Sequence, residues 1–175
     1  MIRFLVRARM KLTSRAVATE KIRDELRRYL GLMHYVPREK WGEHVRVPAM
    51  MGVDPDMREW SLLDICEHNA IVNRSIREVV TSLVTQEPMK HVIDPKKDVM
   101  PKGELGQKAL DEFKQSVEDY LKAVDSYKGL RSTEQKKHPV FGMLNAHSWH
   151  VMFGLHLQIH RKQAEVVADL LSRDA

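Results

Sequence analysis

Residues 145–170 read NAHSWHVMFGLHLQIHRKQAEVVADL, and they carry the clearest helical pattern in the chain. Apolar side chains recur there at steps of three and four residues, the spacing that places them on one face of an α-helix. Asn145 is a favourable residue to cap the start of this helix. The predicted buried face consists of Trp149, Met152, Phe153, His156, Ile159, His160, Gln163, Val166, Val167 and Leu170. The pattern predicts a long amphipathic helix in a helical protein.

Two histidines of this face, His156 and His160, lie four residues apart. On a helix this spacing leaves about 40° between the side chains and about 6 Å between their Cβ atoms, so both imidazoles can bind one metal ion. The chain contains nine histidines, however, and chance alone often produces such a pair in a chain of this composition. The pair therefore needs a further ligand from another helix before it indicates a metal site.

Three more helices are predicted upstream, over about 14–33, 61–85 and 104–127. Each has apolar residues at helical spacing. Ser61 followed by Asp64 is a weaker, aspartate form of the capping box that starts many helices. No segment alternates between apolar and polar residues as a half-buried β-strand would.

The connections between these helices are long. Residues 34–60 are rich in proline and glycine and predict a loop with no more than a short helical turn. The linker after the second helix is interrupted by Pro88, Pro95 and Pro101. Its extended length of about 55 Å exceeds the length of the second helix, about 37 Å, so the linker can run back along that helix. The second and third helices can then lie parallel to each other.

These features predict an all-α fold, a four-helix bundle with long crossover connections. A length of 175 residues fits a single domain over 1–175. The bundle core is expected over about 14–172, and residues 1–13 form a basic N-terminal extension.

The composition excludes several classes of protein. No apolar run is long enough to cross a membrane. The single cysteine, Cys66, excludes an intramolecular disulfide and a cysteine-based zinc site. A lone cysteine is compatible with a reducing compartment, and the expected location is cytoplasmic. Any metal ion must therefore be bound by histidines and carboxylates.

The formal net charge of +5 is concentrated near the N-terminus. Residues 1–19 contain five basic residues and no acidic one. Three interpretations remain open: a segment that packs its Ile2, Phe4 and Leu5 side on the protein, a targeting stretch, or an anion-binding arm. The rest of the chain mixes both signs without the interleaved aromatic residues of a nucleic-acid platform, so nucleic acid is the weaker candidate partner.

His68 is the best candidate for the third metal ligand, because catalytic zinc or nickel sites typically use three protein ligands. It lies on the second predicted helix among apolar neighbours, where a buried imidazole needs partners for its nitrogen atoms. The alternative is a core histidine that is satisfied by hydrogen bonds. The pair His156 and His160 on one predicted helix and His68 on another together favour the metal site.

Other polar residues near these histidines each have two interpretations. Asp64 either caps its helix or accepts a proton near the metal, and Glu67 is a second candidate proton carrier in catalysis. Gln163 either orients a ligand or substrate or lies on the solvated surface. His147 and His150 project away from His156 and are expected to be exposed or hydrogen-bonded elsewhere. Cys66 points away from His68 and is expected to be a buried structural thiol.

Two stretches together resemble the DinB-like superfamily of metal-binding four-helix bundles. They are WSLLDICEHNAIVN, which begins at Trp60, and HPVFGMLNAHSWHVMFGLHLQIHRKQ, which begins at His138. The family pattern is a tryptophan-serine helix start, a histidine about seven residues later, and a late H-x-x-x-H-x-x-Q helix. The resemblance covers roughly 14–170, and the HPVFGML lead-in is similar to a subgroup without an assigned activity.

The resemblance implies an up-down-down-up bundle, a divalent metal at His68, His156 and His160, and frequent dimerisation, so a homodimer is expected. Relatives include thiol-dependent S-transferases and hydrolases. The expected function is metal-dependent hydrolysis or thiol transfer with zinc or nickel, acting on a small molecule such as a low-molecular-weight thiol. The alternative is a non-catalytic, metal-stabilised bundle related to stress. The basic N-terminal stretch and the pair His147 and His150 depart from the family pattern.

Overall fold

The fold is known here from a computed structural model, which describes residues 2–89, 94 and 97–173. The side chains of residues 1–5 lie outside this description. The predicted packing of Ile2, Phe4 and Leu5 therefore lies outside the described residues, as does Pro95 of the linker. Among the described helices, none is both long and apolar enough to cross a membrane.

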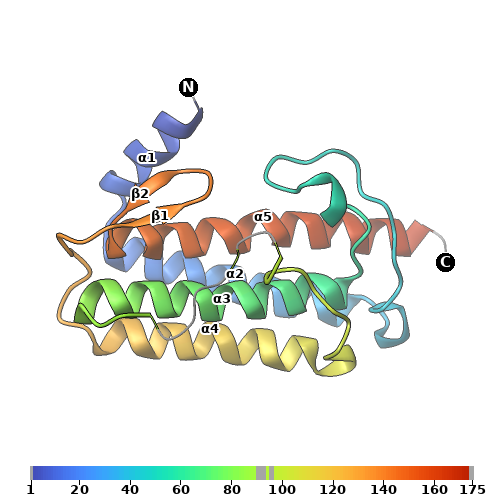
Figure 1. Cartoon of the computed structure of the whole chain (residues 1–175). Coiled ribbons are helices and arrows are strands. Elements are labelled where there is room, and N and C mark those ends of the chain that lie inside the picture. Colours follow the sequence, from blue (N-terminus) through green and yellow to red (C-terminus); the bar gives the residue numbers. More distant parts are fainter. Residues whose placement is uncertain (1, 90–93, 95–96, 174–175) are drawn as a thin grey trace.

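Helices dominate the part of the chain that the structure describes. The order of elements is α1 (Ile2–Leu12), α2 (Arg15–Tyr35), η1 (Arg38–Lys40), η2 (Pro55–Met57), α3 (Leu62–Thr85), η3 (Gly106–Lys108), α4 (Ala109–Ser126), β1 (Lys136–His138), β2 (Gly142–Leu144) and α5 (Ala146–Arg173). The expectation of an all-α protein is confirmed at this level. The four long helices lie side by side, and α1 stands apart at one end (Figure 1).

The helix starts follow the capping residues of the sequence. The hydroxyl of Ser14 accepts a hydrogen bond from the Val17 amide at the start of α2. Ser61 and Asp64 form a complete capping box at the start of α3. The side chain of Asn145 accepts a hydrogen bond from the Ser148 amide at the start of α5. These bonds satisfy amide groups that have no partner within their own helix.

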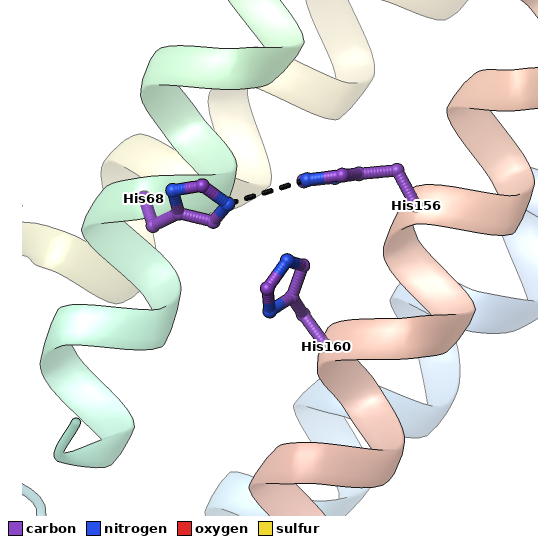
Figure 2. Close-up of side chains that lie close together, drawn as sticks. All are labelled: His68, His156 and His160. Carbon is purple, nitrogen blue, oxygen red and sulfur yellow. Dashed lines mark hydrogen bonds between the residues drawn. The ribbon is translucent and has the colours of Figure 1, made fainter. Parts of the chain in front are cut away.

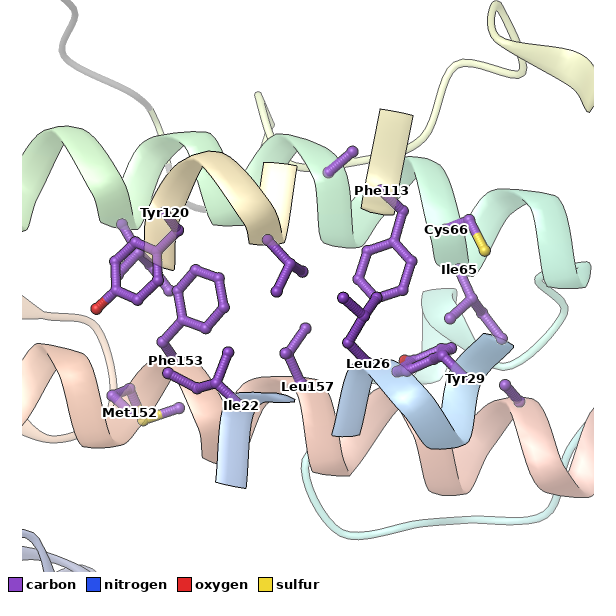
Figure 3. Close-up of a cluster of buried hydrophobic side chains, with 14 of the residues drawn as sticks. Ile22, Leu26, Tyr29, Ile65, Cys66, Phe113, Tyr120, Met152, Phe153 and Leu157 are labelled. Atoms are coloured by element: carbon purple, nitrogen blue, oxygen red, sulfur yellow. The ribbon is translucent and has the colours of Figure 1, made fainter. Parts of the chain in front are cut away.

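The core lies between α2, α3, α4 and α5. Apolar side chains from all four helices meet there (Figure 3). Tyr120 and Phe153 stack with ring centroids 3.8 Å apart, and Tyr29 packs against Phe113 at 4.8 Å. Leu157 is fully buried between these rings and α2. Burial of these large side chains holds the two histidine-bearing helices, α3 and α5, at a fixed separation.

One expectation from the sequence was wrong. Residues 136–144 form a two-stranded antiparallel sheet in which Lys136 pairs with Leu144, although no strand was predicted. Strands of three residues are too short to show an alternating pattern.

The basic N-terminal segment, which was predicted to extend from the bundle, contains helix α1. Arg7 of α1 donates hydrogen bonds to the carbonyl oxygens of Phe141 and Met143, at 3.1 and 3.4 Å, and so ties α1 to the hairpin.

Candidate metal centre

Three histidines meet between α3 and α5. His68 comes from α3, and His156 and His160 come from successive turns of α5 (Figure 2). One ring nitrogen from each histidine lies within 4.8 Å of the other two, and this group can hold a metal ion. The sequence prediction had placed these three residues together, and the structure brings them together.

The closest pair of nitrogen atoms is spaced as metal ligands are. His68 Nε2 and His156 Nε2 lie 3.2 Å apart. Two imidazole nitrogens that bind a tetrahedral zinc ion at about 2.0–2.1 Å lie about 3.3 Å from each other. The ring of His160 lies 4.6 Å from each of the other two rings, measured between centroids. The donor set therefore fits a transition metal that prefers imidazole, such as zinc or nickel.

The orientation of the His68 ring is fixed by the linker that follows α3. Its Nδ1 lies 2.6 Å from the carbonyl oxygen of Val99. A carbonyl oxygen can only accept, so Nδ1 carries the hydrogen and the lone pair of the neutral ring is on Nε2. That lone pair faces His156. A hydrogen bond of this kind is the usual support of a metal-binding histidine.

His160 is held in the same way by Gln163. Its Nδ1 donates to Gln163 Oε1 at 2.9 Å, and Gln163 Nε2 donates to the carbonyl oxygen of Met57 at 2.6 Å. Both ends of the amide are used, which fixes its orientation. Gln163 is fully buried, so the solvated-surface interpretation was wrong. The orienting interpretation agrees with its hydrogen bonds.

His156 differs from the other two histidines. Its Nδ1 is buried and has no hydrogen-bond partner among the described residues. Buried polar nitrogens are rarely left in this state. The ring also faces two other imidazoles and has no charged partner among them. In the structure His156 Nε2 donates to the lone pair of His68 Nε2, and a metal ion bound by the three rings would take the place of this hydrogen bond.

The environment keeps all three histidines neutral at physiological pH. Burial lowers the pKa of His68 to about 4 and the pKa of His160 to about 3. Burial, together with repulsion by the neighbouring histidines, lowers the pKa of His156 well below its ordinary value. Neutral imidazoles keep the lone pairs that bind metal ions, so metal binding at pH 7 would displace few protons.

Trp60 forms an apolar wall of the centre. Its ring centroid lies 4.8 Å from that of His68 and 6.1 Å from that of His160. The tryptophan is itself buried. An apolar wall limits access of water and strengthens electrostatic interactions inside the site. Trp60 is part of one of the two sequence motifs, but no role in the site was predicted for it.

The loop before α3 approaches α5 closely at Gly52. This residue has a positive φ of 85°, and a Cβ atom there would lie 3.0 Å from Ile159 Cδ1. Glycine is therefore required on both counts. The close approach brings the carbonyl of Met57 to Gln163. No sequence pattern predicted the roles of the Met57 and Val99 carbonyls, because a side-chain pattern carries no information about backbone groups.

Asp64 takes its capping role. Its Oδ2 accepts from the amide of Ser61 at 2.9 Å and from the Ser61 hydroxyl at 2.7 Å, and its own amide donates to that hydroxyl. His44 Nδ1 lies 3.4 Å from the same carboxylate. These contacts direct the side chain to the loop, and Asp64 is not in the histidine group. Its catalytic role stays a prediction.

Glu67 anchors the linker. The buried carboxylate accepts hydrogen bonds from the amides of Lys102 at 3.0 Å and Gly103 at 3.1 Å. The same segment supplies the Val99 carbonyl to His68. Glu67 thus supports the centre through the backbone and is not in the histidine group. Its role as a proton carrier also stays a prediction.

The extra histidines lie outside the centre. His150 is fully buried, with Thr19 Oγ1 3.0 Å from Nε2 and the Tyr120 hydroxyl 2.9 Å from Nδ1. His147 Nε2 donates to the Thr13 carbonyl at 2.9 Å. Both residues take the hydrogen-bonded alternative that the sequence left open.

Cys66 is a buried thiol, as expected. It is 1% exposed, and burial raises its pKa to about 12. A thiol in this state is neither a nucleophile nor a metal ligand at neutral pH.

Comparisons of the chain with models of known protein families, with curated proteins and with solved structures gave no match. The chemistry of this centre is therefore argued from its own residues and from the sequence motifs.

Proposed function

We propose that the chain is a divalent-metal protein of the DinB-like superfamily, with zinc or nickel bound by His68, His156 and His160. One observation carries the proposal: hydrogen bonds at Nδ1 of His68 and His160 leave the lone pair of each ring on Nε2, the atom that can bind a metal ion. His156 adds a half-buried ring beside them. The hydrogen bonds from His68 to Val99 and from His160 to Gln163 orient both rings, as hydrogen bonds of this kind do in metal sites. A cluster of histidines that arose by chance would not need them.

The corresponding fold is a single-domain four-helix bundle of the up-down-down-up type. The colours of Figure 1 support this order, because α2 and α5 run one way along the bundle and α3 and α4 run the other way. The linker between α3 and α4 returns along the helices, as a crossover connection must. The same family resemblance favours a homodimer, which sedimentation velocity would test.

The proposed activity is hydrolysis of a small molecule or transfer to a thiol. With three neutral ligands a divalent ion keeps its full charge, and it would acidify a water or a thiol and polarise a carbonyl group. A low-molecular-weight thiol would have to come from outside, because Cys66 is buried and protonated. Asp64 and Glu67 are the candidate proton carriers, and each would have to leave its hydrogen bonds to reach a substrate.

A non-catalytic, metal-stabilised bundle is the second candidate. Burial favours it, because His68 and His160 are each 2% exposed. A substrate would have to reach the ion from the side of His156, which is half-buried. In a non-catalytic bundle the metal would act as a cross-link between α3 and α5 and would stabilise the fold alone.

Turnover separates these candidates. The metal-loaded protein would be assayed against a panel of activated esters, amides and thiol acceptors. The enzyme proposal predicts turnover that a His160→Ala variant loses and a His147→Ala variant keeps, since His147 lies outside the centre. Metal binding without turnover across the panel would favour the non-catalytic bundle.

A further inference from the structure

A second site lies at the end of the helices where α2 and α5 begin and α4 ends. Helix α1 meets α2 there, and the loop after α4 passes close by (Figure 1). A pocket of about 850 Å³ opens between these segments. It is formed by residues 11–15, residues 128–131 and the beginning of α5. None of these segments contributes to the histidine centre.

The lining of this pocket is strongly basic. Lys11, Arg15, Lys128 and Arg131 all line it, and none of the described residues that line it is acidic. Lys11, Lys128 and Arg131 are exposed, and no hydrogen bond or ion pair to another described residue engages their side chains. Cations that repel each other without a local counter-ion raise the potential of the cavity and favour an anion.

Two helix starts add to this potential. Neither α2 nor α5 has an acidic residue in its first turn, where acidic residues usually occur. Ser14 and Asn145 cap these starts, but no carboxylate of the first turn neutralises the positive partial charge of either helix. The helix starts alone would not define a site, but here they border the same cation-lined pocket.

The walls are fixed by hydrogen bonds that do not involve the side chains of Lys11, Lys128 and Arg131. Arg15 donates to the carbonyl oxygens of Tyr127 at 3.0 Å and Val124 at 2.6 Å, which joins the start of α2 to the end of α4. His147 donates to the Thr13 carbonyl at 2.9 Å, which joins α5 to the turn before α2. Three elements are thus joined around the pocket, and it is preorganised for binding.

We propose that this pocket binds a small anion with several negative charges, such as a molecule that carries a diphosphate. The combination of four cations and a confined volume favours a compact, multiply charged ligand. A nucleic-acid backbone would instead favour an extended basic groove with large aromatic residues for stacking, and the described lining contains no Phe, Tyr or Trp. The proposal is independent of the metal centre.

Inorganic pyrophosphate is the probe, titrated by calorimetry into the full-length protein before and after treatment with EDTA. The proposal predicts binding in both cases, because the pocket is separate from the histidines. It also predicts weaker binding as salt rises. Binding that disappears after chelation would place the anion on a metal ion and overturn the proposal.

Two double variants locate the bound anion. Lys128→Gln with Arg131→Gln removes two exposed lining cations and should weaken binding by at least about tenfold, because both can donate charged hydrogen bonds to the anion. Lys108→Gln with Lys162→Gln removes the same charge away from the pocket and should change binding by less than about twofold. Equal weakening by both variants would overturn the proposal, as would the absence of binding by the wild type.

A final experiment measures the binding of single-stranded oligonucleotides of increasing length, with and without pyrophosphate as a competitor. The proposal predicts that pyrophosphate competes with them and that the oligonucleotides gain little affinity from added length. Affinity that grows steeply with oligonucleotide length, and that pyrophosphate does not reduce, would assign this surface to nucleic acid and overturn the small-anion proposal.

Discussion

His160 and Gln163 form one unit of the centre, because the imidazole Nδ1 donates to the amide oxygen of Gln163 at 2.9 Å, one turn along α5. The same amide donates to the Met57 carbonyl at 2.6 Å. The histidine, the amide and the loop before α3 are therefore mechanically connected. A substitution of Gln163 should therefore change the affinity of the centre for metal, although Gln163 is not itself a metal ligand.

Gln163→Ala should lower the affinity for zinc by about 10–100-fold, the usual cost of losing a residue that orients a metal-binding histidine. Gln163→Glu keeps an acceptor for Nδ1 and should lose less. Competition with a fluorescent zinc chelator measures both affinities. Gln158→Ala is the matched control, since Gln158 on the same helix pairs with Lys21 and should leave the affinity unchanged. Equal affinity in all three variants would contradict the account.

Glu67→Ala should weaken metal binding although the carboxylate does not touch the histidines. Glu67 accepts the amides of Lys102 and Gly103 and so holds the segment whose Val99 carbonyl orients His68. Loss of this anchor lets the ring of His68 rotate. Chelator competition should show a lower affinity than in Glu104→Ala, a change at an exposed residue of the same linker. A loss of turnover with unchanged metal affinity would instead assign Glu67 to proton transfer.

The amphipathic spacing of the sequence was sufficient to predict α3 and α5 and the three histidines between them. Any long helix with one buried face shows apolar residues at a period of 3.6 residues, which can be recognised in the sequence. The capping residues Ser61 and Asn145 correctly predicted where α3 and α5 begin. The supports of the centre were harder to predict. Val99 and Met57 act through carbonyl oxygens, and their positions depend on the path of two long connections that no local pattern determines.

His150 should make the stability of the protein depend on pH. Burial lowers its pKa to about 4, whereas an unfolded histidine titrates near 6.5. Between these values the unfolded chain binds a proton that the folded chain does not, so the free energy of unfolding falls as the pH falls. The protonation of this residue alone should lower the free energy of unfolding by about 2 kcal/mol between pH 7.5 and pH 5.

Urea unfolding of the wild type and of His150→Gln at both pH values measures this contribution. The difference between the two proteins isolates His150 from the other buried histidines. The variant should be less stable at pH 7.5, because Thr19 and Tyr120 lose their partner. It should also lose less stability on acidification. The same loss in both proteins would show that His150 does not titrate as expected.

Glu25 and Arg161 form a buried ion pair between α2 and α5, with Nε 2.5 Å from Oε2 and both side chains at most 6% exposed. Glu25→Leu leaves the guanidinium buried, with Glu165 as its one remaining carboxylate among the described residues, and should cost about 3–5 kcal/mol of unfolding free energy. The double variant Glu25→Leu with Arg161→Leu should cost less than the single one. Thermal unfolding of both variants tests this order, and a double variant at least as unstable as Glu25→Leu would contradict it.

The metal content of the purified protein tests the central claim most directly. Elemental analysis by mass spectrometry should find about one equivalent of zinc or nickel per chain, or the metal-free protein should take it up on addition. At metal a thousandfold above its dissociation constant, binding should stabilise the fold by about 4 kcal/mol. The variant His68→Ala, His156→Ala, His160→Ala should bind no metal and show no such shift. A metal-free wild type whose melting temperature does not change with zinc or nickel would contradict the account.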